Sequence, residues 1–362
     1  MAESILVYRL GSLGDTVVAI PSLHRVRRSF PKATLVMLTN KPVSGKAAAL
    51  EAILGDGYFS HHSLCYPSGT RNPLHFISLL FTIRRLRITT MVYLAAARSR
   101  KDVWRDRLFF RLCGIRRIIG LPQWESDFKL QIQPSTGLYE NEASRLACRI
   151  RELGPVDLED CAFWDLHLEE SERGNAEEFI KPLKGHPFLA VSQGTKVQAN
   201  DWGAANWSEL LKQLTQVLPD WGLLLLGSSD EAERAASCAA VWRGRVVNMC
   251  GKSNPRVSAA ALGQAVFFLG HDSGPMHLAS AVGVPCVAIF SARNPPGRWY
   301  PHGVRHKVLY HQTTCYGCKL TECVAEGKRC LLGITVGEVM GVVMELLREL
   351  PSCAALVDPE LA

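Results

Sequence analysis

A polar turn between two apolar runs carries the residues best suited to bind a phosphate. Residues 266–269 are typical of a buried strand, and the turn GHDSG follows them at residues 270–274. Pro275 at a first helical position predicts a short helix that ends at Gly283, before a second buried strand at residues 285–290. Such a unit directs backbone N–H groups and a helix N-terminus beyond the sheet edge, where phosphate groups bind. The alternative is an ordinary parallel-sheet crossover.

A second candidate for chemistry is the loop GSLGD at residues 11–15, which follows an apolar strand predicted at residues 5–10. Glycines permit tight backbone geometry there, and an acid at the start of the next helix is electrostatically favoured. The spacing is not that of the dinucleotide fingerprint GxGxxG. Asp15 is therefore interpreted as either a helix N-cap or a carboxylate that accepts a proton from an acceptor hydroxyl.

Most of the 12 cysteines are isolated in apolar contexts, where cysteine behaves as a small hydrophobe. Four are patterned, because they fall within sixteen residues and open with a CxxC: Cys315, Cys318, Cys323 and Cys330. Thiolates in this arrangement select zinc or iron in a tetrahedral site, so a structural metal is expected. The alternative is a set of buried or oxidisable thiols. The cluster follows the last predicted strand, which argues against a catalytic role.

The net charge of +7 is unevenly distributed. Between residues 71 and 120 there are twelve Lys and Arg against two acids, a local net charge of +10. The segment also mixes basic with apolar and aromatic residues, as in WRDRLFF at residues 104–110, which is typical of interfacial helices. We expect an anionic acceptor or an anionic membrane surface as its partner, with a solvated basic face as the alternative. No nucleic-acid-binding module accompanies the charge, so nucleic acid is not expected.

The periodicity predicts two alternating α/β halves, and hence two doubly wound domains. The domains are expected at residues 1–165 and 166–335, with a final helix in residues 336–362 that packs back on the first domain. Strands are predicted at 5–10, 34–39, 90–95, 117–121, 188–192, 221–227, 246–249, 266–269 and 285–290. Helices are predicted at 16–29, 43–54, 74–87, 101–113, 141–153, 170–181, 207–218, 230–242, 257–264 and 336–350.

Four motifs in order resemble glycosyltransferase family 9, the heptosyltransferase family of lipopolysaccharide assembly, over about residues 5–335. They are YRLGSLGDTVVAIP at 8–21, GTK at 194–196 followed by Trp202 and Trp207, GSSDE at 227–231, and DSGPMH at 272–277 followed by GVP at 283–285. The resemblance implies a GT-B architecture of two Rossmann-like doubly wound domains facing an interdomain cleft. It also implies an acceptor bound mainly by the first domain, a nucleotide-sugar bound mainly by the second, inversion at the anomeric carbon and no catalytic metal.

Carried over by position, the resemblance makes Asp15 the catalytic base. It assigns the donor to residues of the later motifs: Thr195 and Lys196 at the diphosphate, Glu231 at the nucleoside, and Asp272, Ser273, Gly274 and His277 at the phosphate and sugar. Such an enzyme must stabilise the leaving diphosphate with helix N-termini, hydroxyls and a cation. One position departs from the family, because Asn200 stands where a lysine is typical. Arg105, Arg107 and Arg111 of the basic segment are expected to bind the acceptor.

The expected function is transfer of heptose from ADP-heptose to an anionic glycolipid acceptor such as a lipopolysaccharide core. One alternative is an epimerase of UDP-sugars, whose motifs would not place GSLGD at the first loop. Another is a glycosyltransferase that uses a different nucleotide-sugar, or a catalytically silent sugar-nucleotide-binding protein. Neither a signal peptide nor a membrane-spanning run is evident. A cytoplasmic protein, peripheral at the inner membrane, is expected.

Overall fold

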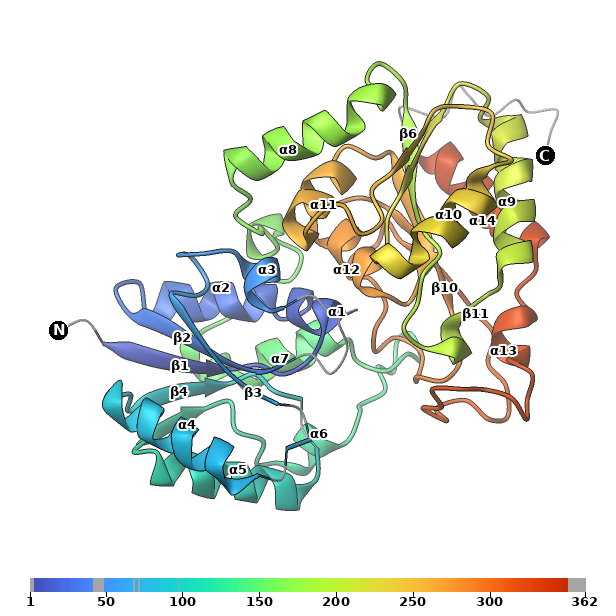
Figure 1. Cartoon of the computed structure of the whole chain (residues 1–362). Helices are drawn as coiled ribbons and strands as arrows, with labels where there is room; N and C mark the ends of the chain where they lie inside the picture. The colour runs from blue at the N-terminus through green and yellow to red at the C-terminus, as the bar shows by residue number, and fades with distance from the viewer. Residues whose placement is uncertain (1–2, 42–48, 68, 71, 97, 351–362) are drawn as a thin grey trace. The chain divides into compact units, whose positions relative to one another are not determined.

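The computed structural model describes residues 3–41, 49–67, 69–70, 72–96 and 98–350 (Figure 1). The chain divides into two compact units, Met1–Leu168 and Glu169–Ala362, and the boundary predicted after residue 165 lies three residues earlier. Each unit has its own parallel sheet with helices on both faces, which confirms the predicted α/β class. None of the described helices combines the length and the apolar composition needed to cross a bilayer.

The first unit is organised around a five-stranded parallel sheet with the order β3-β2-β1-β4-β5. Ile5, Leu6 and Val7 of the central strand are fully buried, as expected where helices cover both faces. In the register of the sheet, Leu6 pairs with Val36 on one side and with Met91 on the other. Because the chain winds outward in both directions from β1, the carboxyl end of β1 is a topological switch point. The strands are β1 (Ser4–Tyr8), β2 (Thr34–Lys41), β3 (His62–Pro67), β4 (Thr90–Tyr93) and β5 (Arg117–Ile119).

Helices cover both faces of this sheet. On one face α4 and α5 contact each other, and Ile83 and Phe110 pack with Leu6 of the sheet. On the opposite face α2 and α7 contact each other (Figure 1). The helices are α1 (Leu13–Val17), α2 (Ile20–Ser29), α3 (Glu51–Leu54), α4 (Pro73–Arg85), α5 (Arg100–Leu112), α6 (Glu125–Phe128) and α7 (Glu142–Arg149).

The first unit differs from the sequence prediction in four places, one of which is the short helix α6, which was not predicted. The helix predicted at 16–29 is two helices, because Pro21 near the start of α2 has no N–H to continue the ladder from α1. The strand β3 was not predicted, since its half-exposed sequence HSLCYP contains no apolar run. Residues 42–48, in which the first half of the predicted helix 43–54 falls, lie outside the described residues, and α3 accounts for its last turn.

The second unit contains a six-stranded parallel sheet with the order β11-β10-β9-β6-β7-β8. The chain winds outward from β6 to β8, returns to β9, and winds outward again to β11, so the ends of β6 and β9 form the switch point. The unit predicted at 266–290 is confirmed as β9, α12 and β10. The edge strand β11 was not predicted, since three of its four residues are only partly buried. The strands are β6 (Phe188–Ser192), β7 (Gly222–Leu225), β8 (Val246–Asn248), β9 (Phe267–His271), β10 (Cys286–Phe290) and β11 (Lys307–Tyr310).

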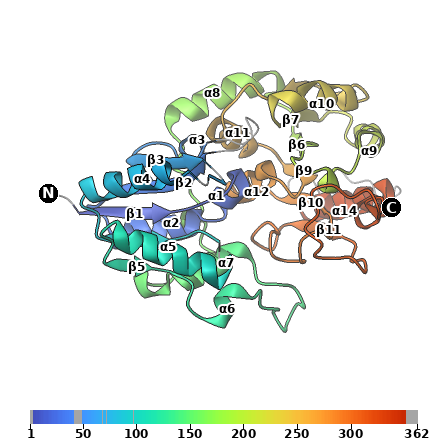
Figure 2. The same cartoon turned by 60° about the horizontal axis from the view of Figure 1, so that its bottom comes forward.

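The helices of the second unit form two layers, with α8, α11 and α12 on one face of the sheet and α9, α10 and α14 on the other (Figure 2). Two fully buried tryptophans, Trp202 and Trp207, lie edge to face in the second layer, with ring centroids 5.3 Å apart. Trp202 also donates a hydrogen bond from Nε1 to the carbonyl oxygen of Ile334, at 2.8 Å. The helices are α8 (Glu170–Ile180), α9 (Ala204–Val217), α10 (Ala232–Ala239), α11 (Pro255–Leu262), α12 (Gly274–Ala281), α13 (Arg329–Leu332) and α14 (Val336–Glu349).

The final helix, α14, is packed within the second unit. Its apolar face, with Val339, Val343 and Leu347, is buried in the core of the second unit against α9, β10 and β11. This amphipathic helix is thus anchored in its own unit, and the expected packing on the first domain stays a prediction. Residues 351–362, the remainder of the predicted segment, lie outside the described residues.

Candidate active site

Asp15 lies in the short helix α1, directly after the switch point at the end of β1. Ser12 is the N-cap, so the N-cap interpretation of Asp15 is wrong, and Asp15 instead closes a capping box as the third helical residue. Its Oδ2 accepts hydrogen bonds from the backbone N–H of Ser12, at 2.8 Å, and from the Ser12 hydroxyl, at 3.1 Å. The side chain is 32% exposed. The carboxylate is therefore held in place yet accessible, as a general base must be.

Two neighbours fix the position of Asp15. Gly11 has a φ of +131°, and a Cβ on it would lie 2.3 Å from the Cβ of Asp15, so only glycine fits. The buried guanidinium of Arg9 donates to the carbonyl oxygens of Leu94, at 2.7 Å, and of Asp15, and its Nη2 lies 3.9 Å from Asp15 Oδ1. Burial lowers the pKa of Arg9, and the nearby Asp15 opposes that shift. The sequence interpretation missed Arg9, although an arginine inside an apolar strand is a visible signal.

The residues assigned to the donor come from loops that follow three adjacent strands, β7, β6 and β9. Ser192, the last residue of β6, pairs with Gly270 in β9, so the loops after these two strands start side by side. The carboxyl ends of parallel strands lie at one edge of a sheet, and ligands of doubly wound folds bind at the switch point there. The structure thus brings to one edge of the second sheet the positions Thr195, Lys196, Glu231, Asp272, Ser273, Gly274 and His277.

Several buried polar side-chain atoms at this edge lack hydrogen-bond partners within the described part of the chain, among them those of Gln193 and Ser273. Gln193 is 3% exposed, and neither its amide oxygen nor its amide nitrogen is paired. Ser273 is the N-cap of α12, yet its buried hydroxyl forms no capping bond and has no other partner. An unpaired buried polar group costs about 1–3 kcal/mol, so such groups require an explanation. A polar ligand at the N-terminus of α12 would supply the missing partners.

Gln193 was not identified from the sequence. Its position directly after β6, the central strand of the second sheet, is the only signal that it carries. Its burial depends on neighbouring loops that come from distant parts of the chain.

Glu231 joins the loops that follow β6 and β7. Its Oε2 accepts a hydrogen bond from the backbone N–H of Ser228, at 2.7 Å, which closes a capping box. Its carboxyl group lies so close to Gly194 that a Cβ on that residue would be 2.0 Å from Glu231 Cδ. The acid therefore sits against the loop of Thr195, whose hydroxyl accepts a hydrogen bond from the backbone N–H of Val197, at 3.2 Å.

Asn200, which replaces the lysine typical of the family, has a structural role. It is 5% exposed, and its Oδ1 accepts a hydrogen bond of 2.5 Å from the Ser291 hydroxyl at the end of β10. Lys196 remains the cation in this loop, and its side chain is exposed. The departure from the family pattern therefore moves the positive charge four residues upstream, to the outer part of the loop.

Asp272 and His277 lie at the start of α12 and in its first turns. Asp272 Oδ2 accepts a hydrogen bond of 3.4 Å from Asn294 Nδ2, which links the turn to the loop after β10. His277 is buried, and its ring lies edge-on to Trp299, with centroids 6.2 Å apart. The packing of His277 is equally typical of a core histidine, so its contact with a donor stays a prediction.

The predicted acceptor residues belong to α5, within a surface that is both basic and apolar. Exposed apolar side chains form one stripe on each of two neighbouring helices: Leu74, Ile77 and Phe81 on α4, and Trp104, Leu108 and Leu112 on α5. Exposed arginines accompany them: Arg84, Arg85, Arg87, Arg105, Arg107 and Arg111. We call these twelve residues the α4–α5 surface. Arg71, the first residue of the predicted basic segment, lies outside the described residues.

The three predicted acceptor arginines are not equivalent. Arg105 pairs with Asp102 and Asp106, each at 3.3 Å. Arg111 donates to the carbonyl oxygen of Arg116, at 2.5 Å, beyond the end of α5. Arg107 is exposed on the outer side of the helix. Of the three, Arg107 is therefore the one best placed to meet an anion without giving up a contact within the protein.

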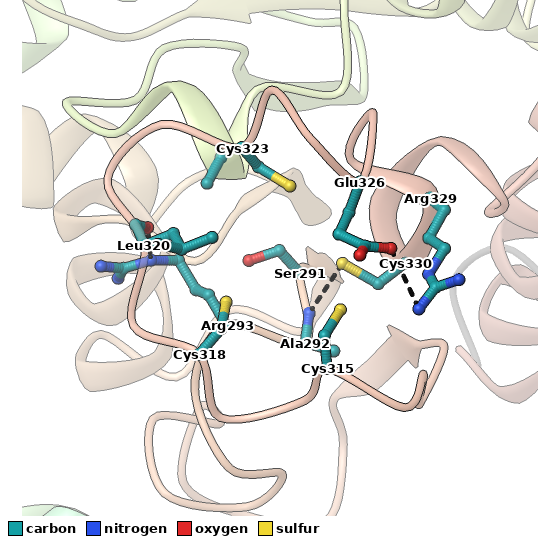
Figure 3. Close-up of a pocket in the computed structure, with 11 residues that line it drawn as sticks. Ser291, Ala292, Arg293, Cys315, Cys318, Leu320, Cys323, Glu326, Arg329 and Cys330 are labelled. Atoms are coloured by element: carbon teal, nitrogen blue, oxygen red, sulfur yellow. Dashed lines mark hydrogen bonds and ion pairs between the residues drawn. The ribbon is translucent and has the colours of Figure 1, made fainter.

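The four patterned cysteines lie together at the end of β10, around a small cavity beside Ser291 and Ala292 (Figure 3). The other described cysteines are isolated, either buried, as Cys113 and Cys286 are, or exposed, as Cys65 and Cys161 are. The structure therefore gathers the cysteines that the spacing selects.

Two doubly wound units, each with its polar loops at a switch point, are the architecture of the GT-B fold. The family model of glycosyltransferase family 9 (heptosyltransferase) matches residues 145–329. The match covers half of the chain, and the chain belongs to this family. The resemblance found in the four sequence motifs is confirmed.

The chain is also similar to individual glycosyltransferases of this family. Lipopolysaccharide heptosyltransferase 1 of Pseudomonas aeruginosa is 27% identical over 189 residues, which are 51% of this chain and 48% of that protein. Among solved structures, a family 9 glycosyltransferase of Veillonella parvula is 16% identical with a TM-score of 0.71, covering 96% of this chain and 98% of its own. The ADP-heptose heptosyltransferase II of E. coli is 17% identical with a TM-score of 0.66, covering 96% and 99%. These two structures support the GT-B fold.

Proposed function

We propose that this glycosyltransferase moves heptose from ADP-heptose to the core of a lipopolysaccharide or a related anionic glycolipid. The observation that carries the proposal is the pair of unpaired buried side chains, Gln193 and Ser273, at the switch point of the second sheet. Nucleotide phosphates bind at such edges of doubly wound sheets. Family membership supports a glycosyl transfer reaction. The similar structure of E. coli heptosyltransferase II, whose name includes ADP-heptose, supports ADP-heptose as the donor.

In the proposed reaction the acceptor oxygen bonds to the anomeric carbon while the bond from that carbon to the diphosphate oxygen breaks. Asp15 takes the proton of the acceptor hydroxyl, and the diphosphate leaves with the electron pair. Attack from the face opposite the leaving group inverts the anomeric carbon. The charge that develops on the diphosphate is met by Lys196, the Ser273 hydroxyl and the N-terminus of α12, without a catalytic metal.

The remaining residues proposed to contact the donor lie at the same edge of the second sheet. Thr195 lies in the diphosphate loop, Glu231 is available to the nucleoside, and Asp272, Gly274 and His277 face the phosphate and sugar. Gln193 adds an amide with one acceptor and two donors to this set. This assignment gives the amide of Gln193 and the hydroxyl of Ser273 a partner in the bound nucleotide.

We further propose that the α4–α5 surface rests on an anionic membrane face on the cytoplasmic side of the inner membrane, where a glycolipid acceptor is embedded. Leu74, Phe81 and Trp104 are each more than 60% exposed, and arginines surround them. Ile83 and Phe110 already bury the inner sides of these helices, so the outer apolar stripes lie outside the core that the described residues form. Apolar side chains that enter the headgroup region, flanked by arginines, are the features of an interfacial helix pair.

The test of the donor is a panel of nucleotide diphosphates followed by a transfer assay. ADP should raise the melting temperature more than UDP or GDP, because a ligand at 100 times its Kd adds about 2.7 kcal/mol to the free energy of unfolding. ADP release from ADP-heptose should then depend on a lipopolysaccharide-core acceptor. Stabilisation by another nucleotide would point to a different nucleotide-sugar. Binding of ADP-heptose without turnover, over a range of acceptors, would favour a silent sugar-nucleotide-binding protein.

A further inference from the structure

The segment from residue 311 to residue 328 is a long connection without helix or strand, between β11 and α13. Its apolar side chains are poorly covered: Val324 is 80% exposed and Leu320 is 45% exposed. Long structureless connections inside compact domains are uncommon and need something to hold them. Three of the four patterned cysteines lie in this connection, and Cys330 lies just beyond it in α13.

The four cysteine side chains converge on one small cavity (Figure 3). The cavity measures about 20 Å³, which is room for a single atom of about the size of a water molecule. Ala199, Ala292 and Leu320 complete much of its wall, so the wall is rich in sulfur and apolar carbon. Such a lining suits a soft thiolate-binding ion better than a water molecule, which needs two to four polar partners.

Hydrogen bonds already support the sulfur atoms. The backbone N–H of Ala292 donates to Cys330 Sγ, at 3.4 Å, and the hydroxyl of Thr313 lies 3.4 Å from Cys315 Sγ. Metal thiolates are commonly stabilised by such outer contacts.

The charged residues around the cavity leave a net positive charge. Arg293, Arg329 and Glu326 line the cavity, and Glu326 pairs with Arg329 at 3.0 Å. Arg293 is fixed to the same connection, since it donates to the carbonyl oxygens of Leu320, at 2.7 Å, and Lys319, at 3.1 Å. Four thiolates around a divalent ion leave an excess of two negative charges, which Arg293 offsets in part.

From these contacts we propose that Cys315, Cys318, Cys323 and Cys330 bind one tetrahedral metal ion, zinc or iron. As the metal–sulfur bonds form, the thiol protons are released to solvent. Within the described residues no three ligating side chains are already gathered closely enough to hold an ion. Binding therefore draws the sulfurs inward, to about 2.3 Å from the metal. Gly317, with a φ of +75°, gives the CxxC turn the backbone freedom for this adjustment.

The metal would act as a structural clamp. The backbone N–H of Gly317 donates to Ala292 O, at 2.7 Å, and that of Cys323 donates to Gln198 Oε1, at 2.9 Å. The clamp would thus tie the connection to the end of β10 and to the loop that carries Asn200. These segments lie beside the donor residues, so the metal supports them without touching the reaction.

The first test is metal analysis of the full chain purified under reducing, anaerobic conditions from cells supplied with zinc and iron. We expect about one ion per chain, and the element recovered distinguishes zinc from iron. Cys318→Ser and Cys323→Ser should lower the metal content by about tenfold or more. Cys161→Ser is the matched control, because Cys161 is an exposed, isolated cysteine, and it should keep the metal.

A second measurement does not depend on the variants being folded. Wild-type chain stripped by a chelator should bind added Co²⁺ with the absorption of a tetrahedral cobalt thiolate, and its melting temperature should rise again. The proposal would be overturned by intact chain that carries no metal and gives no cobalt thiolate spectrum, or by mass spectrometry that finds disulfides among the four cysteines. None of these readouts uses sugar transfer, so failure here is separate from failure of the proposed function.

Discussion

At the scale of single residues, Asp15 offers the sharpest test of chemistry. Asp15→Asn should lower the turnover number by about 100-fold or more while leaving ADP affinity nearly unchanged, because a base acts only on the acceptor. The measurement is steady-state transfer at saturating acceptor, with ADP binding measured in parallel.

A matched control separates basicity from helix capping. Asp127 is also the third residue of a short helix and accepts the hydrogen bond of its N-cap backbone, at 2.8 Å. Asp127→Asn should therefore show any loss that comes from capping alone, without the loss of turnover. Full activity in the Asp15 variant would remove this residue from the mechanism.

Gln193 provides a second test, in which stability and binding should move in opposite directions. Gln193→Met removes a buried amide without partners, so the ligand-free chain should become more stable by about 1 kcal/mol. The same change should weaken ADP binding by about tenfold, since the ligand loses hydrogen bonds worth about 1.4 kcal/mol. Urea unfolding with and without ADP measures both effects.

Gln216 supplies the comparison for that variant, because it is an exposed glutamine on α9. Gln216→Met should alter neither the free energy of unfolding nor the ADP affinity by more than a few tenths of a kcal/mol. If Gln193→Met leaves the stabilisation by ADP intact, the amide does not contact the donor.

The sequence alone predicted the roles of some site residues and not of others. Asp15 was identifiable because its glycines and its acid are neighbours in the chain, and the structure shows Gly11 in contact with Asp15 itself. Asn200 was recognised only as a departure, since its partner Ser291 lies 91 residues away. Gln193 gave no local pattern at all, because an unpaired amide is a property of packing and not of spacing.

At the scale of elements, buried strands were the most predictable and edge strands the least. β6 was predicted at its observed bounds because all five of its residues are buried and apolar apart from Ser192. Both missed strands, β3 and β11, lie at sheet edges and are partly exposed, so they lack the apolar run that marks an inner strand. The split of α1 from α2 is likewise a local effect of Pro21 within a segment that otherwise looked continuous.

The last residue of β9 makes the stability of the second unit sensitive to acid. His271 is fully buried and its Nε2 accepts a hydrogen bond of 3.2 Å from the backbone N–H of Trp202, which requires a neutral ring. Burial lowers the pKa of His271 from 6.5 to about 4; Asp201 opposes the shift, while Arg234 and Lys328 reinforce it. The unfolded chain therefore binds more protons between these two values, and stability falls as the pH drops below 6.5.

The expected loss from His271 is about 2 kcal/mol in the free energy of unfolding between roughly pH 7 and pH 5. Urea unfolding followed by tryptophan fluorescence at several pH values measures it. His271→Gln keeps an acceptor for Trp202 without a titrating ring, so it should flatten the pH dependence. His186→Gln, at a partly exposed histidine, should leave the pH dependence unchanged. An unchanged slope in the His271 variant would assign the acid sensitivity to other groups.

At the scale of the whole molecule, the number of sheets and their parallel winding followed from the alternation of elements along the chain. The packing of α14 did not, because its amphipathic sequence fits any apolar groove and only the assembled second unit shows which one it fills. The sequence showed the basic residues of the α4–α5 surface but not how its apolar residues are arranged. Its two apolar stripes became apparent only when the structure showed which sides of the helices are buried.

The combination of charge and exposed apolar stripes predicts two separable contributions to membrane binding. Arg85→Gln with Arg107→Gln should weaken binding to anionic vesicles by about 30-fold at low salt, since each arginine near such a surface contributes about 1 kcal/mol. The difference from wild type should shrink as salt rises, because charges are screened over about 8 Å at physiological ionic strength. Phe81→Ser with Trp104→Ser should instead remove a part of the binding that salt does not affect.

Vesicle co-sedimentation at low and high salt, with anionic and with zwitterionic lipid, measures both contributions. Val304 is 93% exposed in the second unit, so Val304→Ser tests whether any exposed apolar side chain matters. We expect Val304→Ser to bind like wild type, and ADP affinity to stay the same in every variant, because the donor residues belong to the other unit. If both paired variants sediment with anionic vesicles as wild type does, the α4–α5 surface is a solvated face. The glycolipid acceptor would then have to be recognised from solution, by its sugars alone.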